Sequence, residues 1–133
     1  MRLAIVGSRE YDKKLKIKEF IYELREKEGD DLEIVSGGCK TGADRLAKQC
    51  CNELEVKYVE FPPAHFPHNQ YCVLGPFKYG KQYAVWHYFE RNKQIVEYSD
   101  YVVAFIPEGV VSNGTNNTIE HANKLEKKVI IIN

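Results

Sequence analysis

Three short stretches of this chain combine glycine with hydroxyl, amide or guanidinium side chains, which are the groups that bind phosphate. They read "VGSR" at residues 6–9, "SGGCKTGADRLA" at 36–47 and "PEGVVSNGTNNTIE" at 107–120. Glycine lets backbone N–H groups approach a ligand closely, and a helix that begins after such a turn offers free N–H groups to an anion. Arg9 adds a guanidinium that can pair with phosphate through two parallel bonds. The three stretches therefore predict an anion site.

The stretch at 36–47 fits neither of the two common phosphate-binding patterns. No Lys-Ser or Lys-Thr pair follows Gly42, and the stretch lacks the G-x-G-x-x-G spacing of dinucleotide sites. Asp44 falls in the first turn of the helix that we expect there, where it favours helix initiation and could accept a bond from a ribose hydroxyl. The alternative is a plain glycine-rich turn, with Ser8 capping a second turn and Arg9 in solvent.

The third stretch predicts a second anion site that faces the first. Gly114 frees the backbone, and Thr115 has the residue type of a helix N-cap. Glu120 could serve as a general acid or base, or it could form an ordinary surface pair with Lys124 four residues later.

Residues 82–98 predict a helix with a polar residue on its apolar stripe. Asn92 shares that stripe with Val85, Phe89 and Val96, so it needs hydrogen-bond partners or a ligand. Arg91 lies on the flank of the stripe and is a second candidate phosphate ligand. The aromatic side chains of the segment "WHYFERN" pack in the core or stack on a base.

Strands and helices are expected to alternate along the chain. Apolar runs occur at 3–6, 32–35, 56–61, 101–106 and 129–132, and helix-like segments at 15–28, 43–54, 82–98 and 115–127. This alternation predicts an α/β fold, a Rossmann-like doubly wound and mainly parallel five-stranded sheet in the order 3-2-1-4-5, with helices on both faces. Ligands bind such sheets where the strand order reverses, so the three glycine-containing stretches should meet there.

Composition limits the function. The 133 residues predict one domain, and 19 basic side chains balance 19 acidic ones, which argues against broad nucleic-acid binding. No apolar run reaches a membrane span and no secretory signal is recognised, so we expect a cytoplasmic protein. The four cysteines form no C-x-x-C pair and predict no metal site; Cys50 is expected in the core. The long connection at 62–81 is expected to form a lid.

Taken together, the motifs resemble the SLOG superfamily and, within it, the YspA-related family. The resemblance covers essentially the whole chain: "GSR" at 7–9, "SGGCKTGADRLA" at 36–47, "RN" at 91–92, "SD" at 99–100 and "NGT" at 113–115. It implies one SLOG-like Rossmannoid domain over 1–133 that binds a nucleotide or nucleotide-derived ligand. The residues that would line the site are Gly7, Ser8, Arg9, Ser36, Gly37, Gly38, Gly42, Asp44, Arg91, Asn92, Gly114 and Thr115.

Two relatives within the superfamily supply alternative functions. The LOG-type phosphoribohydrolases cleave an N-glycosidic bond of nucleoside monophosphates; here Thr118 stands where their pattern has glutamate, so Glu120 and Asp44 are the candidate catalytic groups. The DprA-like proteins bind single-stranded DNA, which zero net charge disfavours. We expect a small-molecule partner, no membrane and no bound cofactor; whether copies of the chain associate stays open.

Overall fold

The computed structural model describes residues 1–63, 82, 84 and 86–133 of the chain. Strands and helices alternate along it, with one short 3-10 turn at Gly29–Asp31. The strands are β1 (Arg2–Gly7), β2 (Glu33–Ser36), β3 (Lys57–Glu60), β4 (Tyr101–Phe105) and β5 (Val129–Ile132). The helices are α1 (Lys14–Glu28), α2 (Gly42–Leu54), α3 (Trp86–Tyr98) and α4 (Asn113–Lys124).

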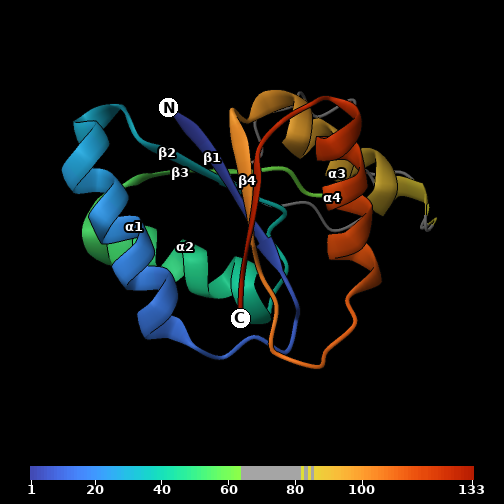
Figure 1. Cartoon of the computed structure of the whole chain (residues 1–133), viewed down its shortest axis with the longest axis horizontal. Coiled ribbons are helices and arrows are strands. Elements are labelled where there is room, and N and C mark those ends of the chain that lie inside the picture. Colours follow the sequence, from blue (N-terminus) through green and yellow to red (C-terminus); the bar gives the residue numbers. More distant parts are fainter. Residues whose placement is uncertain (64–81, 83, 85) are drawn as a thin grey trace.

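The sheet confirms the predicted topology. Its five strands are parallel and run in the order β3-β2-β1-β4-β5. Helices α1 and α2 cover one face and α3 and α4 the other, as Figure 1 shows with the sheet between the two pairs. The chain winds outward from β1 in both directions, so the strand order reverses between β1 and β4.

Alternation of side chains along the strands gives each helix pair its own core. In β1, Leu3 and Ile5 face α1 and α2, whereas Ala4 and Val6 face α3 and α4. Cys50 is fully buried in the first of these cores, as predicted. A strand that is buried on both faces reads as a continuous apolar run, which is why the central strands could be found in the sequence.

Two helices begin at other residues than the sequence predicts. Helix α3 begins at Trp86 and not at residue 82; Gln82 and Ala84 are not helical. Helix α4 begins at Asn113 with Ser112 as its cap, so Thr115 is not the N-cap but lies within the first turn. The expected lid falls almost entirely on residues that the structure does not describe.

No helix in the described ranges is long and apolar enough to cross a membrane.

Helices α1 and α2 are joined at the surface by one carboxylate and two ammonium groups. Glu53 of α2 lies 2.5 Å from the amine of Lys14 and 2.9 Å from that of Lys18, both on α1. These two contacts lower the pKa of Glu53 from 4.5 to about 2. All three side chains are more than one-third exposed, so solvent screening keeps the contribution of the cluster small.

The cluster predicts a specific acid sensitivity. A carboxylate whose pKa is lower in the folded state stabilises that state above its unfolded pKa, and the contribution is lost as pH falls from about 4.5 through about 2. Glu53→Gln should therefore lower the thermal midpoint slightly at pH 7 and leave it nearly unchanged at pH 2. Calorimetry at both pH values measures this; an equal decrease at both would contradict the ion-pair origin. Glu19→Gln is the control, because Glu19 is an exposed carboxylate of α1 outside the cluster.

Candidate functional site

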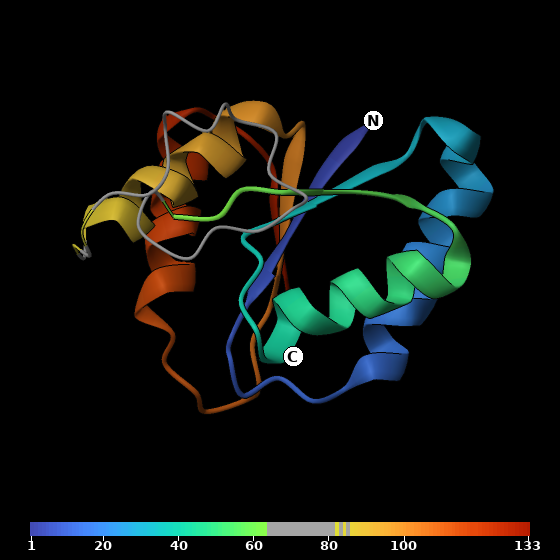
Figure 2. The ribbon, with the colours of Figure 1, turned by 180° about the vertical axis from the view of Figure 1, so that it is seen from behind.

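A cavity of about 340 Å³ lies at the carboxyl ends of the central strands, where the strand order reverses. The loops after β1 and β4 lie side by side there, at the lower edge of both ribbon views (Figures 1 and 2). The turn after β2 and one side of α3 complete the wall. The predicted site residues that line it are Gly7, Ser8, Arg9, Gly37, Asp44, Arg91, Asn92, Gly114 and Thr115.

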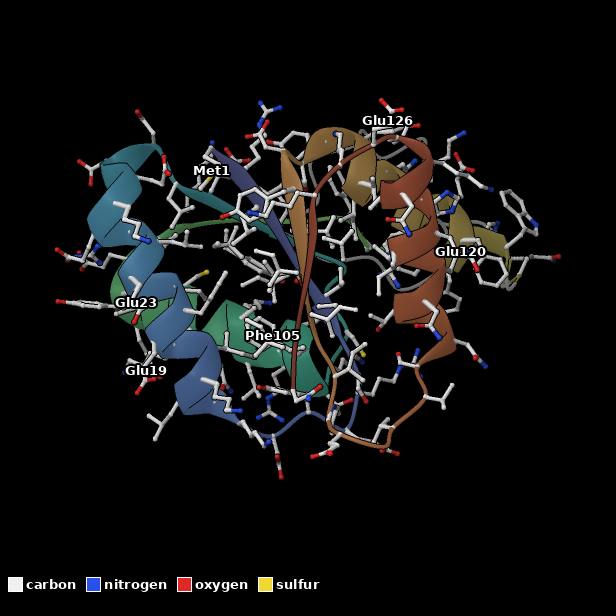
Figure 3. The ribbon with its side chains drawn as sticks, in the orientation of Figure 1. Met1, Glu19, Glu23, Phe105, Glu120 and Glu126 are labelled. Carbon is white, nitrogen blue, oxygen red and sulfur yellow. The ribbon has the colours of Figure 1, made fainter. Side chains whose placement is uncertain are left out.

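Four predicted site residues do not line this cavity. Ser36 is buried at the end of β2, and Gly42 packs against the loop after β1. Gly38 lines a second cavity on the other side of the turn. Glu120 is exposed and projects from α4 away from the sheet (Figure 3), and no ion pair with Lys124 forms.

The carbonyl of Ser8 ties the first two loops together. It accepts the N–H of Tyr11 at 3.2 Å and that of Ala43, in the first turn of α2, at 3.1 Å. The N–H of Ser8 in turn donates to the Phe105 carbonyl of β4 at 3.1 Å. The N–H of Ala43, one of the free donors at the start of α2, is therefore already bonded to the protein itself. At Ala43, a backbone carbonyl occupies the position where the sequence predicts an anion.

The start of α4, in contrast, opens into the cavity. Ser112, Asn113, Gly114 and Thr115 all line it, and the first backbone bond of the helix runs from the Asn116 N–H to the Ser112 carbonyl at 2.9 Å. The N–H groups before Asn116 have no acceptor within the helix. The Ser112 and Thr115 hydroxyls bond to each other at 2.7 Å. This turn therefore presents donors and the positive end of the helix dipole to the cavity.

Arg91 is held by the protein as well as facing the cavity. Its Nη1 donates to the Gly37 carbonyl at 2.7 Å and its Nε to Asn92 Oδ1 at 3.0 Å. Burial lowers the pKa of Arg91, and Asp44 nearby acts in the opposite direction. Arg91 thus fixes the glycine turn and supplies positive charge at the cavity wall.

Asn92 has the hydrogen-bond partners that a polar side chain on an apolar stripe needs. Its Nδ2 donates to the Gly114 carbonyl at 3.3 Å and to Asn117 Oδ1 at 3.2 Å. Since its Oδ1 accepts from Arg91, this amide links α3 to the first turns of α4 and to the glycine turn. The link fixes the distance between the guanidinium and the start of α4.

Asp44 is a half-buried carboxylate that stabilises the glycine turn. Its Oδ2 accepts the N–H of Cys39 at 3.1 Å. Burial raises the pKa of Asp44, and the charge of Arg91 is the largest influence that opposes the increase. Of the two candidate catalytic acids, Asp44 is the one that reaches the cavity, while Thr118 occupies the wall where the LOG pattern has its glutamate.

The aromatic segment of α3 divides between the cavity and solvent. Tyr88 and Phe89 line the cavity, and the Phe89 side chain is 43% exposed. Trp86 is 58% exposed, so the first of the two alternatives, packing in the core, does not apply to it. His87, which the sequence did not single out, is the buried member of the segment. A helix that covers an edge of the cavity leaves its outer face uncovered, and the apolar pattern does not distinguish the two faces.

Sequence reasoning missed several residues of the wall. They are Glu10, Cys39, Ile95, Val110, Val111, Ser112, Asn113 and Thr118. Ser112 could have been found from its residue type, since Ser is a preferred N-cap and Asn113 follows it. The apolar members carry no such signal, because a Val in a loop is indistinguishable in the sequence from a packed one.

Comparisons with known proteins find a family model that matches the first part of the chain. Residues 1–66 match the model of the YspA, cpYpsA-related SLOG family, which confirms the resemblance seen in the motifs. No curated protein sequence matches the chain.

Two solved structures share the fold. A molybdenum cofactor binding protein from the phototrophic bacterium Rippkaea orientalis has a TM-score of 0.71 at 22% identity, and the match covers 98% of this chain and 74% of that one. The molybdenum cofactor carrier protein of Chlamydomonas reinhardtii has a TM-score of 0.67 at 14% identity, with the same coverage. At these identities the likeness establishes the fold.

The interlocked loops predict that Gly42 tolerates no side chain. Its φ is +74°, and a Cβ there would lie 2.2 Å from the Ser8 carbonyl oxygen and 2.4 Å from Arg9 Cα. Gly109 is a matched control, since its φ is +80° and a Cβ would meet nothing within 4 Å. Backbone strain alone costs about 1–2 kcal/mol. Urea unfolding should show that loss for Gly109→Ala and at least about 1 kcal/mol more for Gly42→Ala; equal losses would contradict the interlock.

Proposed function

Because residues 1–66 match the model of the YspA, cpYpsA-related SLOG family, we propose that this chain binds a phosphorylated, nucleotide-derived small molecule in the cavity between β1 and β4. One observation carries the proposal. The open first turn of α4 and the guanidinium of Arg9 line the same cavity, at the reversal of strand order where α/β folds bind ligands.

The phosphate belongs at the start of α4. The N–H groups of residues 113–115 have no acceptor among the described residues, and together with the helix dipole they favour an anion there. The side chain of Arg9 is exposed and has no hydrogen-bond partner in the described ranges. Two carboxylates, Glu10 and Asp44, also line the cavity, but Arg91 lies close enough to Asp44 to influence its pKa and offsets that charge. The wall also has apolar side chains, Phe89 and Val111 among them, which can pack against the carbon atoms of the ligand.

A phosphorylated pterin is a second candidate ligand. Both similar structures are of molybdenum cofactor proteins, and the organic part of that cofactor is a pterin that carries a phosphate. The same helix turn and Arg9 fit such a phosphate. Mass spectrometry of small molecules that copurify with the protein, together with elemental analysis for molybdenum, separates the two candidates.

The other functions expected from the sequence stay alternatives. N-glycosidic hydrolysis would depend on Asp44, whose bond to the Cys39 N–H already gives it a structural role. Binding of single-stranded nucleic acid would need more positive charge than Arg9 and Arg91 bring to the cavity. A cytoplasmic location and association between copies remain predictions.

Loss of Arg9 should weaken phosphate binding without unfolding the protein. A charge-assisted hydrogen bond contributes about 1.5–3 kcal/mol, so Arg9→Ala should lower affinity for ribose 5-phosphate roughly tenfold or more in calorimetry. Arg2→Ala is the matched control, because Arg2 lies at the opposite end of the same strand and stacks on Tyr98. Equal affinity of both variants and the unaltered protein would refute this phosphate site.

Nucleoside monophosphates should bind without losing their base. Glu120 is exposed outside the cavity, and geometry comes before pKa in judging an acid-base group. Chromatography of a monophosphate panel after long incubation should show no free base. Base release that disappears in Glu120→Gln would contradict the position of this carboxylate; release that fails in Asp44→Asn would instead support the hydrolase.

A further inference from the structure

The last residue of β3, Glu60, is a fully buried carboxylate that the cavity described above does not use. One of its oxygens, Oε1, accepts a hydrogen bond from the Tyr58 hydroxyl at 2.9 Å. The other, Oε2, is buried and receives no hydrogen bond from any described residue. A buried carboxylate oxygen without a donor is costly, so a donor from outside the chain would stabilise it.

Glu60 lines a second cavity of about 780 Å³ between α2 and β3. Three basic residues, Lys40, Arg45 and Lys48, line the same cavity, and the Lys48 amine lies 3.9 Å from Glu60 Oε1. The side chain of Glu60 is 1% exposed and that of Lys48 is 37% exposed. A hydrogen-bond acceptor therefore lies deep in this cavity, and cations lie nearer its opening.

A chain of hydroxyl groups fixes which oxygen of Glu60 is available. The Tyr58 hydroxyl has one proton, and both Glu60 Oε1 at 2.9 Å and Ser36 Oγ at 3.1 Å lie within reach of it. Ser36 Oγ also accepts from the Gly38 N–H at 3.3 Å. All of these contacts lie on the Oε1 side of the carboxylate, and Oε2 keeps its lone pairs for another donor.

The glycine turn brings this carboxylate next to the first cavity. A Cβ on Gly38 would lie 2.3 Å from Glu60 Cδ, and a Cβ on Gly37 would lie 2.4 Å from Arg91 Nη1. Two adjacent glycines therefore separate a buried anion from a half-buried cation. Cys39, the next residue, lines both cavities, so they meet at its side chain.

We propose that Glu60 selects the ring of the ligand by accepting the two adjacent N–H donors of a 2-amino-4-oxo edge, which guanine and pterin rings share. This rests on the proposed function, in which the phosphate of the same molecule lies in the first cavity. A carboxylate accepts two parallel N–H bonds. Adenine presents a ring acceptor in place of one donor, which the carboxylate repels. The three cations disfavour a positively charged group and favour a neutral ring with an anionic tail.

Calorimetry with five probes tests the ring selection on the unaltered protein. Guanosine 5′-monophosphate should bind at least about tenfold tighter than inosine 5′-monophosphate, which lacks the amino group, because one hydrogen bond to a charged acceptor is lost. Adenosine 5′-monophosphate should bind no better than ribose 5-phosphate. Equal affinities for the three nucleotides would overturn the proposal. Dihydroneopterin monophosphate in place of guanosine 5′-monophosphate shows which of the two rings is preferred.

Glu60→Gln identifies the residue responsible. The variant keeps the side-chain size and an oxygen for Tyr58, and it should reduce the guanosine preference to within about twofold while ribose 5-phosphate binds as before. Glu55→Gln is the control, since Glu55 lines the same cavity but is exposed. A preference that survives in Glu60→Gln would refute the assignment. Absence of binding for every probe, ribose 5-phosphate included, would instead refute the phosphate site of the proposed function.

Discussion

The close approach of the loop after β1, the first turn of α2 and the end of β4 at Ser8 is the constraint on which the site depends. This one oxygen accepts hydrogen bonds from the loop after β1 and from the first turn of α2, while the N–H of the same residue bonds to β4. The approach is possible because Gly7 and Gly42 have no side chains: a Cβ on either would lie 2.2 Å from a backbone oxygen. The glycines thus serve packing first, and the cavity is the space that remains beside the packed loops.

The turn after β2 is stabilised by charge from several directions. Asp44 accepts the N–H of Cys39, Arg91 donates to the Gly37 carbonyl, and Glu60 lies directly against Gly38. Glu60 is fully buried, and Asp44 and Arg91 are half-buried. Each of them lies close to a group of opposite sign, which is how proteins tolerate charge that is shielded from water. The turn is consequently a rigid wall with a cation on one side and an anion on the other.

The two helices that begin at the cavity have different roles. Helix α2 uses its first turn to hold the loop after β1, through the N–H of Ala43, and places Asp44 at the wall. Helix α4 begins two residues earlier than the sequence suggested, with Ser112 as its cap, and leaves its first turn open. Asn92 ties that turn to α3. In the sequence, the turns before α2 and α4 are equivalent candidates for an anion site. In the structure, the first turn of α2 is bonded to the loop after β1, and only the first turn of α4 is open to the cavity.

The sequence by itself determined the fold, because strands buried on both faces must be apolar throughout and the turns between them contain glycine. It also determined which turns meet, since the carboxyl ends of parallel strands share one edge of the sheet. Tertiary structure decided what each polar group does there. The exposure of Glu120 depends on which face of α4 is buried, namely the face of Thr118 and Ala122. The availability of Glu60 depends on Tyr58 and Gly38. A residue type states which bonds a side chain can make, and the neighbours that folding brings to it decide which bonds remain.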